Sequence, residues 1–412
     1  MEIERNLSMT KRSLLKSIVG DTSRNASIHD LSDYHIVEIL VRLPVKTIVH
    51  CKFVCRDWLN LITNSHFITL QLPKSPECFM LFDKYIRDLI TKPKLLRLEE
   101  IEEEHGRDIL HHDPIMRLDL NRVPSFQNDR LCALGSVNGL ICLICLSDSD
   151  YGRDKIHICN PITGEYMILP EQIHCKEIDT VNSYGFGVSS LSGEYKVIRI
   201  FHDNTLSRRV LHAEIYTLGT GKWRSLTLGH VTYSVYGYSG TFLNNHIHWN
   251  IHEYEDPHKK ICTFDIDNET FQLFPSPPVD LEEDLWYLRM LGVLDGCLCY
   301  SCYCRTSCVV SIWVMKEYGI GNSWQKKILI TESISPILHG PYDILCFPMG
   351  SFKDGRILMM SFSGKLLVYH PNTHTIEKTQ FSDVNAISYR PSFVKLQNFE
   401  SESVHKFPLE TC

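Results

Sequence analysis

Cysteine thiols are the first groups in the chain whose spacing could support chemistry. Two C-x-x-C pairs occur, and two further cysteines follow the second pair; these residues are Cys142, Cys145, Cys299, Cys302, Cys304 and Cys308. A structural zinc site needs four converging ligands, with the second pair usually about 12–20 residues after the first. Here the pairs are far apart, and each follows a predicted hairpin turn. Residues i and i+3 of a strand point to opposite faces, so neither pair can chelate one ion from a strand. The later cysteines could do so only if the chain loops at residues 305–307.

Histidine and glycine give two further patterns. His246, His248 and His252 fall on one face of a predicted strand, close to a two-histidine metal pattern, although strand histidines are more often structural. Residues 219–222 resemble a phosphate loop, but Trp223 follows directly and favours a hairpin turn. The chain has no G-x-S-x-G, H-E-x-x-H, G-x-G-x-x-G or G-x-x-x-x-G-K-[ST] motif. We expect no cofactor, no metal and no catalytic residue.

Composition narrows the function classes further. The chain has 42 Lys and Arg against 49 Asp and Glu, a formal net charge of −7, so it has no general attraction to nucleic acid or anionic membranes. Sixteen cysteines among 412 residues are too few for a short secreted disulfide scaffold. The first twenty residues are too charged for a signal peptide, and no apolar run is long enough to cross a membrane. We expect a cytoplasmic and/or nuclear protein with reduced thiols.

The elements that must position these residues differ between the two parts of the chain. Residues 31–67 have a helical period, with Pro44 ending the first of three short predicted helices, a second over residues 45–54 and a third closed by Asn64. The apolar stripe of the first helix consists of Ile36, Ile39, Leu40 and Leu43. So small a bundle cannot hide all its apolar residues, which predicts a partner surface.

These helices carry a recognisable motif. The strings E-I-L-V-R-L-P-V-K at residues 38–46 and V-C-R-D-W at residues 54–58 are similar to the F-box of plant F-box proteins. The resemblance is incomplete at the start, where Ser32, Tyr34 and His35 replace the Pro, the acidic residue and the Leu that are usual in the family. We expect these changes to weaken the cap of the first helix and to lower the affinity for an adaptor.

From about residue 130 the pattern changes to short alternating strands with turn signals. Five turns are each followed by an apolar residue that starts a strand, at a period of about fifty residues typical of kelch-like propeller blades. These apolar residues are Tyr166, Trp223, Phe271, Trp324 and Ile376. Steps such as Asn138-Gly139, Asp295-Gly296 and Asp354-Gly355 supply positive φ angles for hairpin turns.

The strings N-P-I-T-G-E-Y-M-I-L-P and Y-G-F-G-V-S-S-L-S-G-E-Y-K-V-I-R-I within this part resemble the F-box-associated domain. The predicted fold is therefore a small all-α, three-helix F-box over residues 28–70 and an all-β, kelch-like β-propeller over residues 75–396, with flexible segments at 1–27 and 397–412. Five blades are plain. We expect a sixth to be shared between residues 78–82 and 388–395, which would close the ring. The acidic stretch 99–108 is expected to be a solvated loop.

The resemblance implies a non-catalytic substrate-recognition subunit of an SCF-type E3 ubiquitin ligase. The F-box would dock on a Skp-type adaptor and through it on cullin, while propeller loops bind an unknown protein substrate. We expect the adaptor contact at Leu31, Ile39, Leu40, Leu43, Pro44, Val54, Cys55 and Trp58. Loops with aromatic or charged residues suggest substrate contacts at Tyr254, Trp286 and Tyr287, with packing in the core as the alternative for Trp286 and Tyr287. Two alternatives stay open: a propeller enzyme or glycan- or protein-binding module with accessory helices, and an F-box scaffold that acts outside a ubiquitin ligase.

Overall fold

The computed structural model divides the chain into two compact units, residues 1–74 and 75–412. The structure describes residues 31–83, 95–104, 107–110, 115–126, 130–146, 154–172, 179–203, 210–226, 233–253, 261–279, 289–304, 307–331, 338, 341–399 and 403–408. The segment 1–27, which we expected to be flexible, lies outside these residues. In the described part, no helix is both long and apolar enough to span a membrane.

The first unit contains four described helices where the sequence predicted three. They are α2 (Asp33–Leu40), α3 (Val45–Cys51), α4 (Arg56–Ile62) and α5 (Ser65–Gln71), followed by the short turn η2 (Leu72–Lys74). Asn64 does not end the helical region: its side chain accepts a hydrogen bond from the backbone N–H of His66 and caps α5. An Asn between two helices fits either role, because the same side chain favours N-caps and turns.

The core of the helical unit is filled by its own side chains. Leu40, Ile48 and Ile62 are almost completely buried, and the Trp58 indole is also buried. Pro44 stands at the N-cap of α3, where its missing N–H breaks no helical hydrogen bond. This packing makes the unit a small bundle in its own right.

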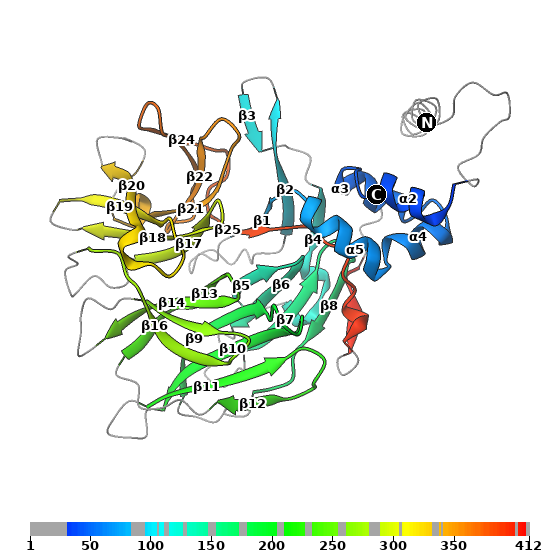
Figure 1. Ribbon diagram of the computed structural model, residues 1–412, viewed down its shortest axis with the longest axis horizontal. Helices are drawn as coiled ribbons and strands as arrows, with labels where there is room; N and C mark the ends of the chain where they lie inside the picture. Colours follow the sequence, from blue (N-terminus) through cyan, green and yellow to red (C-terminus); the bar gives the residue numbers. More distant parts are fainter. Residues whose placement is uncertain are drawn as a thin grey trace. The chain divides into compact units, whose positions relative to one another are not determined.

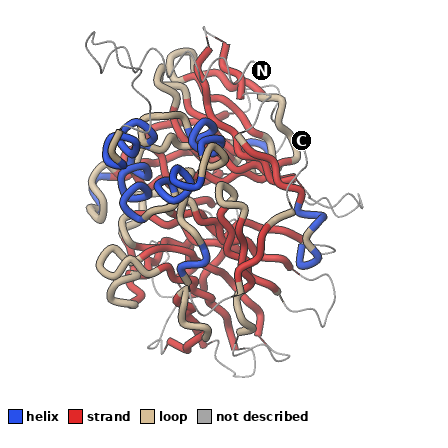
Figure 2. Tube along the Cα trace, turned by 90° about the vertical axis from the view of Figure 1, so that its right-hand side faces the viewer, coloured by secondary structure: helices blue, strands red, loops and turns tan. Residues whose placement is uncertain are grey.

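The second unit is built almost entirely of strands in antiparallel sheets, as Figures 1 and 2 show. One sheet contains β25 (Val384–Tyr389), β1 (Cys78–Asp83), β2 (Leu95–Glu104), β3 (Arg107–Leu110) and β4 (Met116–Asp119). The next contains β5 (Arg130–Val137), β6 (Leu140–Leu146), β7 (Lys155–Asn160), β8 (Glu165–Ile168) and β26 (Val404–Lys406).

The central sheet has eight strands in two meanders, joined by one parallel bridge between Ser239 and Tyr184. The first meander is β9 (Asp179–Val188), β10 (Tyr195–Asp203), β11 (Val210–Thr217) and β12 (Trp223–Leu226). The second is β13 (Tyr233–Leu243), β14 (His246–Glu253), β15 (Ile261–Asp265) and β16 (Thr270–Phe274).

Two four-stranded sheets complete the described part. They are β17 (Arg289–Leu294), β18 (Cys297–Cys304), β19 (Val309–Met315) and β20 (Trp324–Thr331), and then β21 (Cys346–Ser351), β22 (Ile357–Ser361), β23 (Leu366–His370) and β24 (Thr375–Lys378). The five apolar repeat residues of the sequence all fall on the fourth strand of a meander, at the first or second position. The Asn-Gly and Asp-Gly turns at 138–139 and 295–296 have the expected positive φ angles at both residues.

The beginning and the end of the second unit meet in one sheet. Strand β1 pairs antiparallel with β25, with Cys78 opposite Tyr389, as the expected closure requires. The C-terminal strand lies at 384–389, a few residues earlier than expected. The two strands lie side by side near the middle of Figure 1.

Two expected loops contain strands. The acidic stretch 99–108 belongs to β2 and β3, because β2 finds backbone partners in β1, β3 and β4, and these override its composition. The segment expected to be a flexible tail after residue 396 includes β26, which pairs with β8, and Phe407, which is only 4% exposed. The largely polar composition of this segment does not reveal that Phe407 is buried.

The inner strands approach closely because glycines face a neighbouring indole. A Cβ added at Gly185 would lie 2.7 Å from the Trp249 ring, and one added at Gly240 would lie 2.5 Å from it. Strands β9, β13 and β14 can therefore pack only with glycine at these positions.

Candidate protein-docking surfaces

The helical unit exposes apolar side chains that its own core does not need. Tyr34 on α2 is 65% exposed, and Phe53 and Val54, in the turn between α3 and α4, are 77% and 47% exposed. Leu59 on α4 is 38% exposed. Several exposed apolar side chains in so small a unit mark candidate contacts for another protein.

The expected adaptor residues divide into two groups. Pro44 and Val54 are exposed, and four others are partly exposed: Leu31, Ile39, Leu43 and Cys55. Leu40 and Trp58 are 1% and 8% exposed and pack inside the helical unit. Their side chains therefore offer little surface to another protein in this structure, and the adaptor contact at all eight residues stays a prediction.

Sequence reasoning missed Tyr34, Phe53 and Leu59 as surface residues. The helical period placed Phe53 on the second helix, but α3 ends at Cys51, so Phe53 lies in the following turn. A sequence signal for this turn was available. The run Phe53-Val54-Cys55 directly precedes Arg56, where α4 begins with Cys55 as its N-cap, so these residues lie between two helices.

Ser32, Tyr34 and His35, which depart from the family motif, lie at the start of α2. Ser32 is the N-cap, but its hydroxyl lies 2.8 Å from Nδ1 of His35 and makes no capping bond to a helix amide. The ring of His35 is also in edge contact with that of Tyr34. The sequence predicts a weak cap for the first helix, and α2 has no side-chain hydrogen bond at its N-cap.

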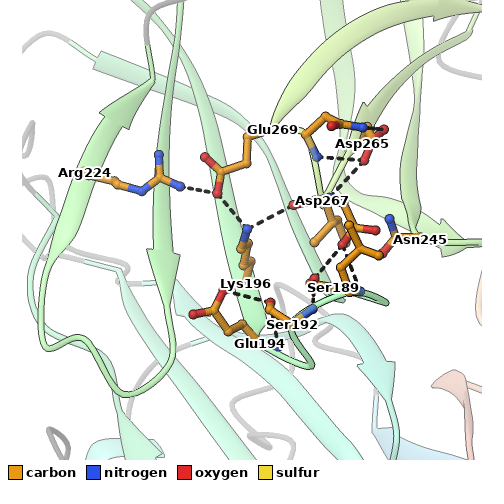
Figure 3. Close-up of polar contacts among 12 residues, drawn as sticks. Ser189, Ser192, Glu194, Lys196, Arg224, Asn245, Asp265, Asp267 and Glu269 are labelled. Carbon is orange, nitrogen blue, oxygen red and sulfur yellow. Dashed lines mark hydrogen bonds and ion pairs between the residues drawn. The ribbon is translucent and has the colours of Figure 1, made fainter.

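On the second unit, a network of polar side chains links hairpin turns from neighbouring meanders (Figure 3). Lys196 on β10 donates to the carbonyl oxygen of Ile266 at 3.0 Å and pairs with Glu269 at 2.7 Å. Glu269 also pairs with Arg224 on β12. Burial alone would raise the pKa of Glu269, but the hydrogen bonds and charges of Lys196 and Arg224 hold this pKa below its usual value.

The same network fixes the turn between β9 and β10. Asp267 accepts hydrogen bonds from the hydroxyls of Ser189 and Ser190, and the Ser190 amide donates to Oδ1 of Asn245 at 2.9 Å. Burial raises the pKa of Asp267, but these hydroxyl donors lower it by more, so the carboxylate is ionised at neutral pH. Leu191, at the tip of this turn, is 84% exposed. An exposed apolar side chain therefore lies at the tip of a turn that hydrogen bonds hold to Asp267 and Asn245.

The residues expected to contact substrate, Tyr254, Trp286 and Tyr287, lie outside the described residues. They remain predictions. Their segments connect strands that the structure does describe, β14 to β15 and β16 to β17.

The cysteine pairs occupy packed strands. Cys299 and Cys302 belong to two different core clusters, as expected for residues i and i+3 of β18. Burial raises the pKa of each of these thiols to about 12, which leaves them protonated. Cys142 is buried in a third cluster, and Sγ of Cys145 lies 3.8 Å from Nδ1 of His157. Among the described residues, no group of three or more His, Cys, Asp or Glu could hold a metal ion.

The strand histidines have structural contacts. His248 is buried; its Nδ1 donates to the carbonyl oxygen of Thr241 at 3.0 Å, and its Nε2 accepts from the Tyr318 hydroxyl at 2.8 Å. Burial lowers the pKa of His248 to about 4, so the ring is neutral at pH 7. His246, on the same face, lies 3.8 Å from Asp265.

Comparisons with known proteins agree with this two-part architecture. The family model of the F-box associated beta propeller domain matches residues 100–408, and that of the F-box domain matches residues 28–70. The F-box protein At3g07870 of Arabidopsis thaliana is 29% identical over 88% of this chain and 87% of its own length. The F-box/kelch-repeat protein At3g23880 of the same plant is 24% identical over 85% of this chain and 91% of its own length.

Proposed function

Because the chain belongs to the plant F-box proteins that carry an F-box-associated β-propeller domain, we propose that it is a substrate-recognition subunit of an SCF-type E3 ubiquitin ligase. In this role the helical unit docks on a Skp-type adaptor, and through it on cullin. The second unit binds a protein substrate.

One observation carries the docking proposal. The helical unit buries Leu40 and Trp58 in its own core and still exposes Phe53 and Val54 side by side in one turn. Exposed aromatic and aliphatic anchors next to a well-packed support are typical of the residues that dominate protein interfaces. We therefore assign the main adaptor contact to Phe53 and Val54, with Leu43 and Pro44 of the motif at residues 38–46 as further contacts.

The domain limits follow from two observations. The division between residues 74 and 75 supports an F-box at 28–70, and the burial of Phe407 supports extending the propeller domain from 396 to 408. We further propose six blades: the eight-stranded sheet supplies two, because its meanders share only one bridge, and the sheet that joins β25 to β1 supplies the shared one.

The mechanism is proximity. A receptor that holds a substrate beside the ubiquitin-conjugating enzyme raises the effective concentration of the reacting groups and needs no catalytic residue of its own. Membership of the F-box family supports a non-catalytic role, and burial keeps the thiols of Cys299 and Cys302 protonated at neutral pH. We propose that the protein acts in the cytoplasm, the nucleus or both.

The test is the affinity of the purified full chain for a Skp-type adaptor, measured by biolayer interferometry. Phe53→Asp should weaken binding by at least about tenfold, because it places a charge in an apolar contact. Leu191→Asp, a matched change at an exposed residue of the second unit, should bind like the wild type. A chain lacking residues 28–70 should not bind. Unchanged affinity of the Phe53→Asp chain would refute the assigned surface, and adaptor binding without residues 28–70 would refute the F-box role.

A further inference from the structure

The outer edge of one sheet carries a strand that ring closure does not need. The ring closes where β25 meets β1, whereas β26 pairs separately with β8, placing Val404 opposite Met167 and Lys406 opposite Glu165. In the described part of the chain, the outermost strands β12, β16, β20 and β24 have no such additional strand. Strand β26 is therefore an addition to a sheet that is otherwise complete.

A buried aromatic residue anchors this added strand. Phe407 is 4% exposed, its ring centroid lies 4.8 Å from that of Tyr166 and 6.3 Å from that of Phe126, and its N–H donates to the carbonyl oxygen of Gly164 at 2.8 Å. The ring of His405 stacks on Tyr166 at 5.2 Å but remains exposed. Strand β26 is thus held at the edge of β8 by its extended backbone and by one buried aromatic side chain.

The segment before β26 is held by contacts of its own. Phe393 and Leu396 are completely buried, and the Leu396 amide donates to Glu165 at 2.9 Å. The Asn160 amide donates to the carbonyl oxygens of residues 392 and 394 at 3.0 and 2.7 Å. Release of β26 would leave these contacts and the β1–β25 pairing in place. Because β26 pairs over only three residues, its local opening should cost far less than unfolding of the domain.

We propose that the edge of β8, with Tyr166, Phe126 and Gly164, is a binding site for an extended peptide segment of another protein, and that residues 404–407 occupy this site intramolecularly. The ligand class is a strand that pairs antiparallel with β8 and places an aromatic side chain where Phe407 lies. Such a segment must displace the tethered β26, which has the advantage of high effective concentration. These contacts support the site whether or not the helical unit docks on an adaptor.

The experiment uses the full chain and a fluorescein-labelled peptide with the sequence of residues 403–409. Phe407→Ser removes the intramolecular anchor, so this chain should bind the peptide at least about tenfold more tightly than the wild type, as measured by fluorescence anisotropy. A peptide with Ser in place of its Phe should not bind. Adding Tyr166→Ala to the Phe407→Ser chain should abolish binding, because it removes a wall of the site.

A second variant and a control complete the test. His405→Pro combined with Phe407→Ser also removes the backbone donor of the residue opposite Tyr166 and so favours release of β26. Phe381→Ser, which truncates a similarly buried Phe packed on another sheet, controls for general loosening. Absence of peptide binding by both the single and the double variant would overturn the proposal. Equal binding by the Phe381→Ser chain would also overturn it, because binding would then report partial unfolding.

Discussion

The indole N–H of Trp249 donates a hydrogen bond to the carbonyl oxygen of Tyr184, 3.0 Å away, and so joins β14 to the innermost strand of the neighbouring meander. Both residues are almost completely buried. The contact exists because Gly185 and Gly240 leave room for the indole on either side. It ties two meanders together where only one backbone bridge connects them.

Gly240→Ala should therefore destabilise the second unit. The new Cβ would lie 2.5 Å from the Trp249 ring, so the indole must move and its bond to Tyr184 weakens. Overpacking of this kind costs about 1–3 kcal/mol in the free energy of unfolding, measurable by urea denaturation. Gly321→Ala is the matched control, since its Cβ would meet only Pro275 at 3.4 Å. Equal stability of the two variants would show that the indole is not confined.

Asn160→Ala should loosen the segment around residues 392–394, whose carbonyl oxygens the Asn160 side chain holds. The side chain of Asn160 is completely buried, donates to two carbonyl oxygens of residues 392–394 and accepts from the Ile162 amide at 3.0 Å. Leaving these buried groups without partners should lower the free energy of unfolding by about 2–4 kcal/mol. Hydrogen exchange should accelerate first in residues 391–399. Asn268→Ala, at an exposed turn, should change neither quantity.

Changes at Trp58 and Phe53 should separate stability from docking. Trp58→Ala opens a cavity in the helical unit and should lower its stability by about 3–5 kcal/mol. Phe53→Ala removes an exposed ring and should change stability by no more than about 0.5 kcal/mol while weakening adaptor binding. Thermal unfolding followed by far-UV circular dichroism, together with adaptor affinity, distinguishes the two. A large loss of stability in the Phe53→Ala chain would place that ring in the core.

Stability should fall on mild acidification because of buried imidazoles. Burial lowers the pKa of His248 to about 4, with His246 lowering it further against the opposing effect of the Thr241 carbonyl. An unfolded histidine has a pKa of about 6.5, so between pH 6.5 and 4 the unfolded chain binds more protons and the free energy of unfolding decreases as pH falls. Protonation of this residue in the unfolded chain lowers the free energy of unfolding at pH 5 by roughly 2 kcal/mol. His157, whose pKa is also lowered to about 4 by burial, acts in the same direction.

Urea denaturation at pH 7 and pH 5 tests this expectation. His248→Gln keeps a donor for Thr241 and an acceptor for Tyr318 but does not titrate, so it should reduce the difference between the two pH values. His66→Gln, at an exposed helical position, should leave that difference unchanged. A wild-type chain that is equally stable at both pH values would contradict the assignment of buried neutral imidazoles.

Much of the fold could be read from local pattern. The helical period, the motif at residues 38–46 and the turn at Asn138-Gly139 each act over a few neighbouring residues, and the structure has elements in these places. The polar turns that recur about every fifty residues predicted that Trp223 and Trp324 each start a strand, and they do.

What local pattern could not settle depends on distant partners. The apolar stripe of the first helix does not tell which of its residues the bundle buries: packing encloses Leu40 and leaves Ile39 partly exposed. The acidic residues 99–104 form a strand because β1 pairs with residues 99 and 100 and β3 with residues 101–104, which composition does not reveal. Phe407 is one of a few apolar residues in a largely polar segment, and it becomes an anchor through contacts with the distant rings of Tyr166 and Phe126.

The pairing of β1 with β25 also has a consequence for biosynthesis. Cys78 must wait for Tyr389, more than 300 residues later, before the two can lie opposite each other. At about 5–20 residues per second of translation, that interval is roughly 15–60 s, during which the nascent β1 lacks one of its two strand partners. The helical unit, by contrast, has all its core residues within 31–74 and can fold soon after it leaves the ribosome. A premature stop codon before residue 384 would thus release a chain with a complete helical unit and an open, aggregation-prone ring.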